Sequence, residues 1–285
     1  MKESFGQIKK IVTRALAEDL GPGDITTNVL IPKDKISDGI IMTREAAVIS
    51  GLRIAAMVFI KVDNKIILKP LVKDGQRVKA NTRLASLQGK TRSILKAERV
   101  ALNFLSHLSA IATKTREFVN AIDGYPAKIM DTRKTTPNLR ILERAAVRQG
   151  GGVNHRFGLN DMVLIKDNHR VATHKRLSFK EMIPLCRQRT HKPIEIEVDD
   201  LKQFNEALEA NPNFILLDNM STAQIEKAVK LRNQQKRYRH IKLEVSGGIT
   251  LQNVRALAQT GIDRISIGAL THTKKAIDVS LELLN

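Results

Sequence analysis

The chain has 285 residues, with 48 lysines and arginines against 29 aspartates and glutamates, which gives a net charge of +19. Hydrophobic residues make up 42% and charged residues 27%, as in an ordinary globular protein that buries a core of normal size. The single cysteine, Cys186, excludes an intrachain disulfide and suits a reducing cytoplasm. The first ten residues lack the apolar core of a signal peptide, and the longest uncharged run, 100–113, is shorter than the ~18 residues of a membrane span. We therefore expect a cytoplasmic protein without a membrane partner.

The excess of positive charge predicts an anionic partner, which can be a nucleic acid, a membrane surface or a polyanionic small substrate. Lysines and arginines are scattered along the chain, and no aromatic stacking motif or zinc-finger spacing accompanies them. The histidines show no HExxH spacing and have no cysteine partners, so no dedicated zinc site is expected. We expect no nucleic-acid partner, although part of the charge can be a basic surface unrelated to function.

The first part of the chain predicts a helix followed by short strands. Apolar residues recur at helical spacing over residues 4–20, and a Gly-Pro-Gly sequence then ends the helix. Residues 36–90 predict short strands joined by turns. A long helix, or two shorter helices, is expected over residues 94–122. We place a domain boundary near residues 110–125, where a turn sequence follows.

From residue 127 onward, short apolar runs alternate with helical stretches. Repeated strand–helix units predict parallel strands joined by crossovers, in a β/α barrel or a doubly wound sheet. Polar residues at the ends of the runs favour the barrel, because a barrel builds its active site where its strands end. These residues are Asp131, Lys166, Asp218 and Ser246. Small-residue loops follow the last two runs, at the usual phosphate site of a barrel.

The segment 131–140 is rich in hydrogen-bond donors. Arg133, Lys134 and Arg140 stand among threonines directly after a strand, which suits phosphate or carboxylate binding. A solvent-exposed turn without a binding role could have the same sequence over this segment alone. That alternative weakens because His155, Arg156 and Lys166 lie before and at the next strand end.

Two predicted strands place charged residues on one face. Glu195 and Glu197 share a face of the run 194–198, and Lys242, Glu244 and Ser246 share a face of a later run. Parallel strands are covered on both sides, so these carboxylates need cationic partners or a metal. We expect a barrel interior lined with both signs of charge, in which some residues can form internal salt bridges.

Several motifs together resemble one enzyme family, quinolinate phosphoribosyltransferase, also called carboxylating nicotinate-nucleotide pyrophosphorylase. The resemblance spans nearly the whole chain, in order. The motifs are EDLGPGDITT (18–27), AERVALNFLSHLSAIAT (97–113), DTRKTTP (131–137), GGGVNHRFGL (150–159), LIKDNH (164–169), EIEV (195–198), LLDN (216–219), EVSGGI (244–249) and ISIGALTH (265–272).

The resemblance implies an α/β fold with two domains. Residues 1–110 would form an N-terminal α/β sandwich domain, and a C-terminal helix over 271–285 would pack with it. Residues 111–270 would form an open α/β barrel of the type II phosphoribosyltransferase kind. The activity implied is transfer of phosphoribosyl from phosphoribosyl pyrophosphate to quinolinate with decarboxylation, in de novo NAD biosynthesis. Family members work as homodimers, or as assemblies of dimers, with shared active sites.

The resemblance also implies roles for individual residues. The catalytic candidates are Lys134, Lys166, Glu197 and Asp218. Carboxylates and phosphates would be bound by Arg133, Lys134, Arg156 and Lys166, with Thr132 and His155 nearby. Glu197 and Asp218 would face the ribose and Mg²⁺ with its pyrophosphate. The 5′-phosphate would be held by Ser246, Gly247, Gly248, Ile267, Gly268 and Ala269, and Arg99 would reach the neighbouring subunit's site.

Two positions depart from the family pattern. Asn138 follows a proline where glycine is usual, and Ala110 replaces a glycine within an otherwise matching motif. Asparagine tolerates a left-handed backbone, so the first change is expected to be mild. Two alternatives remain: a ModD-like protein of the same fold group, and a basic non-catalytic nucleic-acid-binding protein.

Overall fold

The computed structural model describes residues 2–173, 177–273 and 275–284, and it separates into two compact units. Unit 1 is formed by Met1–Arg116, Thr135–Gly151 and Ala269–Asn285. Unit 2 is formed by Glu117–Lys134 and Gly152–Gly268. The boundary expected at residues 110 and 111 falls inside one long helix, α4 (Thr91–Ala121).

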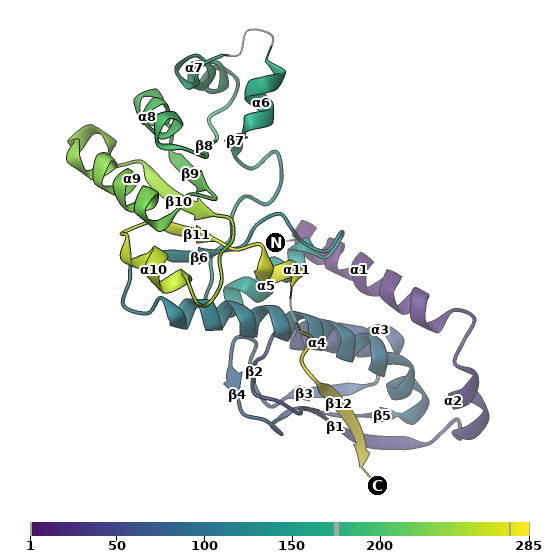
Figure 1. The fold of residues 1–285 in the computed structure, drawn as a ribbon. Helices are drawn as coiled ribbons and strands as arrows, with labels where there is room; N and C mark the ends of the chain where they lie inside the picture. Colours follow the sequence, from purple (N-terminus) through teal and green to yellow (C-terminus); the bar gives the residue numbers. More distant parts are fainter. Residues whose placement is uncertain (1, 174–176, 274, 285) are drawn as a thin grey trace. The chain divides into compact units, whose positions relative to one another are not determined.

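Unit 1 is built on a four-stranded antiparallel sheet (Figure 1). In spatial order its strands are β12 (Val279–Leu284), β1 (Ile36–Thr43), β5 (Arg83–Lys90) and β3 (Ile67–Pro70). A separate pair is formed by β2 (Ala47–Val48) and β4 (Arg77–Val78). Short strands were expected over this part of the chain, and these elements confirm them.

The helices of unit 1 include one that the sequence analysis missed. Residues 36–90 were read as strands and turns alone, but α3 (Leu52–Val62) lies among them and buries Leu52, Ala55 and Phe59 along one side. The long helix α4 is continuous rather than two helices. The remaining helices are α1 (Lys2–Leu20), α2 (Ile25–Leu30), α5 (Arg140–Gln149) and α11 (Ala269–His272).

The expected C-terminal helix over 271–285 is wrong. Among the described residues of this range, the short helix α11 ends at His272, and strand β12 then lies along the edge of β1, with Thr43 opposite Val279 and Asp38 opposite Leu284. A strand is favoured because it satisfies the backbone groups of β1 that would otherwise form an open sheet edge.

Unit 2 contains a six-stranded sheet in which all strands run parallel. In spatial order the strands are β6 (Lys128–Met130), β11 (Arg264–Ser266), β10 (Lys242–Ser246), β9 (Phe214–Asp218), β8 (Ile194–Val198) and β7 (Val163–Ile165). Within unit 2, the first strand in chain order, β6, pairs with the last, β11, as in a β/α barrel. The two edges of this sheet are β6 and β7. This is the α/β barrel arrangement that the sequence predicted.

Helices alternate with these strands and lie along them (Figure 1). Ser221 and Gln224 form the expected capping box at the start of α9. The core between strands and helices contains Ile196, Phe204 and Leu243, each fully buried. Within the described ranges, no helix is both long and apolar enough to cross a membrane. The helices and the 3₁₀ turn are α6 (Asp167–Ala172), α7 (Phe179–Arg189), α8 (Leu201–Ala210), α9 (Thr222–Gln234), η1 (Lys236–Tyr238) and α10 (Val254–Gln259).

Candidate active site

The carboxyl ends of the unit 2 strands bring most of the predicted site residues to one edge of the sheet. Asp218 ends β9 and lies in register with Ser246 at the end of β10. Ser246 is in turn opposite Ser266 at the end of β11, which Ile267 and Gly268 follow. Glu197 lies near the end of β8. This edge is where a β/α barrel places its chemistry.

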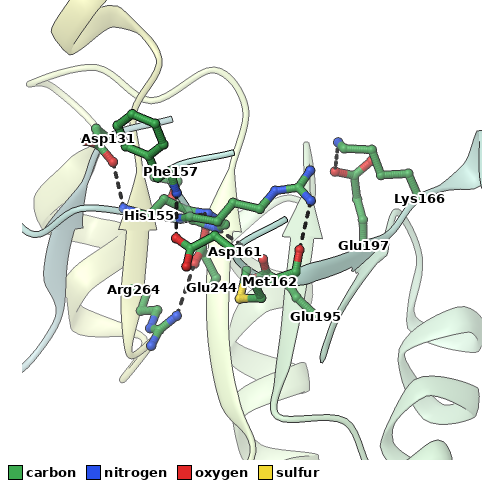
Figure 2. Close-up of polar contacts among 12 residues, drawn as sticks. Asp131, His155, Phe157, Asp161, Met162, Lys166, Glu195, Glu197, Glu244 and Arg264 are labelled. Atoms are coloured by element: carbon green, nitrogen blue, oxygen red, sulfur yellow. Dashed lines mark hydrogen bonds and ion pairs between the residues drawn. The ribbon is translucent and has the colours of Figure 1, made fainter. Parts of the chain in front are cut away.

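Lys166 and Glu197 form an ion pair across neighbouring strands (Figure 2). Lys166 directly follows β7 and is the N-cap residue of α6. The Lys166 side chain is 41% exposed and that of Glu197 is 16% exposed, so both reach solvent at the strand ends. An anionic substrate can therefore compete with Glu197 for the ammonium group.

The loop after β10 is shaped for close approach to its backbone. Gly247 has φ 93° and Gly248 has φ 59°, a region that favours glycine. A Cβ atom on Gly247 would meet the side chain of Asn219, which follows β9. The backbone N–H of Asn219 donates to the carbonyl of Ser246 at 2.9 Å and fixes the two loops together. Turns of this kind suit phosphate binding.

Asp131 anchors the loop that carries His155 and Arg156. Its fully buried carboxylate accepts hydrogen bonds from Nδ2 of Asn154 at 2.6 Å and from the backbone N–H of His155 at 2.7 Å. Nη1 of Arg156 donates to the carbonyl of Met162 at 3.1 Å. The loop is therefore held at both its backbone and its side chains.

The side chain of His155 lies between two buried carboxylates, Glu195 on β8 and Glu244 on β10 (Figure 2). Its Nε2 atom is 3.1 Å from Oε2 of Glu195 and 3.2 Å from Oε1 of Glu244. The His155 side chain is only 8% exposed, and both glutamates are fully buried. The Ser266 hydroxyl donates to Glu244, and Nη1 of Arg264 lies 3.9 Å from Oε2 of Glu244. The inward-facing carboxylates predicted from strand periodicity thus meet cationic and polar partners.

The hydrogen bonds of His155 locate its proton. Its Nδ1 atom accepts the backbone N–H of Arg156 at 2.8 Å, so the ring carries its proton on Nε2. Burial opposes a charged ring, but hydrogen bonds with Glu195 and Glu244, and their charges, raise the pKa of His155 to about 10. Burial and the charge of Glu244 raise the pKa of Glu195 to about 7. The cluster thus retains an additional proton near neutral pH, which His155 and the two carboxylates share.

His155, Glu195 and Glu244 offer three ligand atoms within 4.8 Å of one another, which is compatible with a metal ion. A histidine ligand binds metal through an unprotonated nitrogen, and its other nitrogen normally donates a hydrogen bond. Here Nδ1 accepts one instead, an arrangement that disfavours metal binding through Nε2. The cluster is held together mainly by charge, with a hydrogen bond from the Ser266 hydroxyl to Glu244.

Arg156 lies in an electropositive environment. Burial and the positive charge of Arg133 lower the pKa of its guanidinium, while the charges of Glu195 and Glu197 act in the opposite direction. Arg133 and Lys134 are themselves exposed, and the backbone N–H of Lys134 donates to the hydroxyl of Thr132 at 3.1 Å. The predicted cations of unit 2 thus include two arginines close enough for the charge of Arg133 to act on Arg156.

Three predicted residues belong to unit 1. Arg99 is an exposed residue of α4, and Ala269 is the first residue of α11. Arg140, which the sequence grouped with Arg133, donates from Nε to the hydroxyl of Thr135 at 2.9 Å. Asn138 has φ 66°, which confirms the left-handed backbone expected where the family pattern has glycine.

Sequence models of known domains match almost the whole chain. The N-terminal domain of quinolinate phosphoribosyl transferase matches residues 24–109, and the C-terminal domain of the same enzyme matches residues 111–282. The chain belongs to the quinolinate phosphoribosyl transferase family.

Individual family members agree with this assignment. The chain is 41% identical over 283 residues to the carboxylating nicotinate-nucleotide pyrophosphorylase of Mycobacterium leprae, covering 98% of each chain. It is 37% identical to quinolinate phosphoribosyltransferase [decarboxylating] 1b of Nicotiana tabacum, covering 97% of this chain and 82% of the relative. The solved nicotinate-nucleotide pyrophosphorylase of Francisella tularensis superposes with a TM-score of 0.90 at 38% identity, covering 98% and 96% of the two chains.

Three contacts within the site were not predicted from the sequence. Asp131 was expected only to be a polar residue at a strand end, and neither Arg264 nor Ser266 was predicted as a partner of Glu244. The signal for Asp131 was present, because a carboxylate at a strand end needs donors when it is buried. The partners of Glu244 come from a strand that is distant in sequence, so periodicity within one strand could not show them.

Proposed function

We propose that this chain transfers phosphoribosyl from phosphoribosyl pyrophosphate to quinolinate and releases pyrophosphate and carbon dioxide, giving nicotinate mononucleotide. One observation carries the proposal within this family: cations and carboxylates alternate along the strand ends of unit 2, with Lys166 and Glu197 in direct contact. Such an edge can hold two polyanions and still present negative charge to a cationic carbon. The names of the matched relatives support this activity over a ModD-like or a nucleic-acid-binding protein.

In the proposed reaction, the cations Arg133, Lys134, Arg156 and Lys166 bind the carboxylates of quinolinate and the phosphates. The pyridine nitrogen attacks the anomeric carbon of the ribose as the bond to pyrophosphate breaks. Positive charge develops on the ribose carbon in this step, and Glu197 and Asp218 stabilise it. The cations hold the two anions in line for attack, which removes much of the entropic barrier.

Decarboxylation follows from the charge on the new pyridinium ring. The bond between ring carbon 2 and its carboxylate breaks, and the electron pair remains on that carbon next to the positive nitrogen. Carbon dioxide leaves, and the carbon takes up a proton from solvent. The part of the protein in this step is to hold the ring in place.

Glu197 and Asp218 also fit a magnesium ion. Glu197 uses Oε2 to contact Lys166, and Asp218 uses Oδ2 to accept a bond from Asn219 at 3.0 Å, so the other oxygen of each points to no described donor. Magnesium is usually held by one or two carboxylates together with substrate phosphates. We propose that both residues hold Mg²⁺, which when bound neutralises charge on the pyrophosphate group. Glu197 and Asp218 would therefore contact both the metal ion and the substrate.

The glycine loop after β10 and the residues after β11 are proposed to hold the 5′-phosphate. The proposed contacts are backbone N–H groups and the Ser246 hydroxyl, with Gly247 allowing the phosphate close to the chain. Ile267, Gly268 and Ala269 would complete the site through their backbone. The left-handed glycines of the first loop support this proposal.

We further propose a homodimer in which Arg99 completes the site of the neighbouring subunit. Its exposure on α4 leaves the guanidinium accessible to a second chain. Higher assemblies of such dimers are compatible with this arrangement. A reducing cytoplasm suits a chain whose single cysteine, Cys186, is unpaired, and we propose that location.

The test is turnover of quinolinate compared with nicotinate, each with phosphoribosyl pyrophosphate and Mg²⁺. Quinolinate should yield nicotinate mononucleotide and carbon dioxide. Nicotinate should be a poor substrate, because it lacks the second carboxylate that the additional cations bind. Equal turnover of nicotinate, or no turnover of quinolinate, would contradict the proposal.

A further inference from the structure

Glu195 and Glu244 occupy an energetically costly position. Both are fully buried, and among the described residues neither oxygen of Glu195, nor Oε2 of Glu244, has a well-aligned hydrogen bond. A buried polar group left in this state destabilises the fold, and more so when it is charged. Buried groups of this kind call for a specific explanation, and the reaction scheme above uses neither glutamate.

An unbroken series of contacts joins these glutamates to a proposed substrate-binding residue. Both carboxylates contact Nε2 of His155, at 3.1 and 3.2 Å. The opposite ring nitrogen accepts the backbone N–H of Arg156 at 2.8 Å. Asp131 accepts the backbone N–H of His155 itself. The orientation of the His155 ring therefore fixes the backbone at the point where the Arg156 side chain begins.

We propose that Glu195 and Glu244 are positioning residues, which act through His155 to hold Arg156 where it meets a carboxylate of the substrate. The inference rests on the proposed function, since it takes Arg156 to bind quinolinate. This role accounts for two buried carboxylates next to the cationic residues of the site. Burial and the positive charge of Arg133 disfavour the charged Arg156 guanidinium, whereas the charges of Glu195 and Glu197 favour it.

The first test separates the two substrates. In Glu244→Gln and Glu195→Gln, the KM for quinolinate should rise about 10-fold, as expected from a misplaced binding group, while the KM for phosphoribosyl pyrophosphate stays within about twofold. Asp263→Asn is the control, because Asp263 is a carboxylate of unit 2 outside the cluster, partly buried and paired with Arg232 at 2.8 Å. It should lower thermal stability without changing the KM for quinolinate. A quinolinate KM that is unchanged in folded Glu244→Gln overturns the inference.

A double-mutant cycle tests whether the effect passes through Arg156. In an Arg156→Ala background, Glu244→Gln should cause no further loss of kcat/KM for quinolinate. Full additivity of the two losses would show a general structural role and would contradict the proposal.

Two replacements of His155 separate its two contacts. Asparagine places an acceptor near the position of Nδ1 but cannot reach the glutamates, whereas glutamine reaches the glutamates but leaves the Arg156 N–H without its acceptor. Both variants should raise the KM for quinolinate, because each removes one of the two contacts of His155, either with the glutamates or with the Arg156 N–H. Normal quinolinate binding in His155→Asn would show that the glutamates are dispensable and would overturn the proposal.

One readout does not depend on turnover. Hydrogen exchange of the Arg156 backbone amide should be slow in the wild-type protein and faster in Glu195→Gln and Glu244→Gln. If wild-type protein shows this protection but does not convert quinolinate, the proposed function fails while the positioning of Arg156 stands. If turnover is normal and the amide exchanges equally fast in all three proteins, the positioning role fails while the function stands.

Discussion

Oδ1 of Asn219 lies 2.0 Å from the position that a Cβ atom on Gly247 would occupy. An alanine at this position must therefore displace Asn219 or the loop itself, and φ 93° adds backbone strain. We predict that Gly247→Ala raises the KM for phosphoribosyl pyrophosphate about 10-fold or more, because the proposed phosphate loop is misplaced. Steady-state kinetics with each substrate varied in turn will measure this.

Gly124→Ala is the control for backbone strain alone. Gly124 has φ 86°, but nothing lies within 4 Å of its added Cβ. This variant should lose about 1 kcal/mol of stability and keep both KM values. Equal kinetic effects of the two substitutions would contradict the role assigned to Gly247.

Removing a single cation from the site should reduce catalysis more than stability. We predict that Lys134→Ala or Arg156→Ala lowers turnover by about 10²-fold, as loss of a preorganised charge often does. Thermal unfolding should change little, because a cation that faces an anion site adds little to the core. Near-wild-type activity would argue against the site, whereas a collapse of stability would indicate internal salt bridges instead.

Chelation of magnesium should abolish turnover reversibly. The thermal stability of the free protein should not change, because Glu197 and Asp218 are partly exposed and make protein contacts of their own. Asp218→Asn should raise the magnesium concentration needed for half-maximal activity. Activity that survives exhaustive chelation would exclude the proposed metal.

Mixed dimers test the proposed role of Arg99. Arg99→Ala and Lys134→Ala should each be nearly inactive alone, but a mixed dimer places both defects in one site and leaves the other whole. About half of the wild-type activity is then expected for two independent sites related by a two-fold axis. The two variants can be co-expressed with different tags and purified as the mixed species. No recovery in a confirmed mixed dimer would show that Arg99 does not act across the interface.

A buried carboxylate in unit 1 should make stability depend on pH. Burial raises the pKa of Glu143, but bonds from Nε2 of His107 at 2.8 Å and from the Thr136 N–H at 3.1 Å outweigh it and leave the pKa below its usual 4.5. A lowered folded-state pKa contributes stability that is present above about pH 4.5 and lost as the pH falls through the lower folded value.

Glu143→Gln should therefore cost about 2 kcal/mol near neutral pH, and the difference from wild type should shrink in acid. Urea unfolding at neutral and acidic pH measures both quantities. Glu18→Gln, at an exposed position of α1, is the matched control and should show no such difference. A constant difference at all pH values would contradict the assignment.

The strand ends of unit 2 could be predicted from the sequence because parallel strands share one edge, so Lys166 and Asp218 were placed correctly without knowledge of the pairing. Asn138 was also predicted correctly, since its left-handed backbone depends on local sequence. The contacts of His155 could not be predicted in this way, because Glu195 and Glu244 come from strands that only the folded sheet brings together. The strand β12 was missed for the same reason, since its partner lies at the other end of the chain.

The pairing of β12 with β1 also dictates an order of assembly during synthesis. Thr43 is synthesised long before its partner Val279, because 235 residues separate the two in the chain. All of unit 2 is synthesised between them, so the sheet of unit 1 keeps an open edge while the barrel emerges and folds. The edge can close only after β12 has been synthesised and is free to pair with β1. A nascent chain halted before β12 would therefore carry an incomplete, pairing-competent sheet in unit 1.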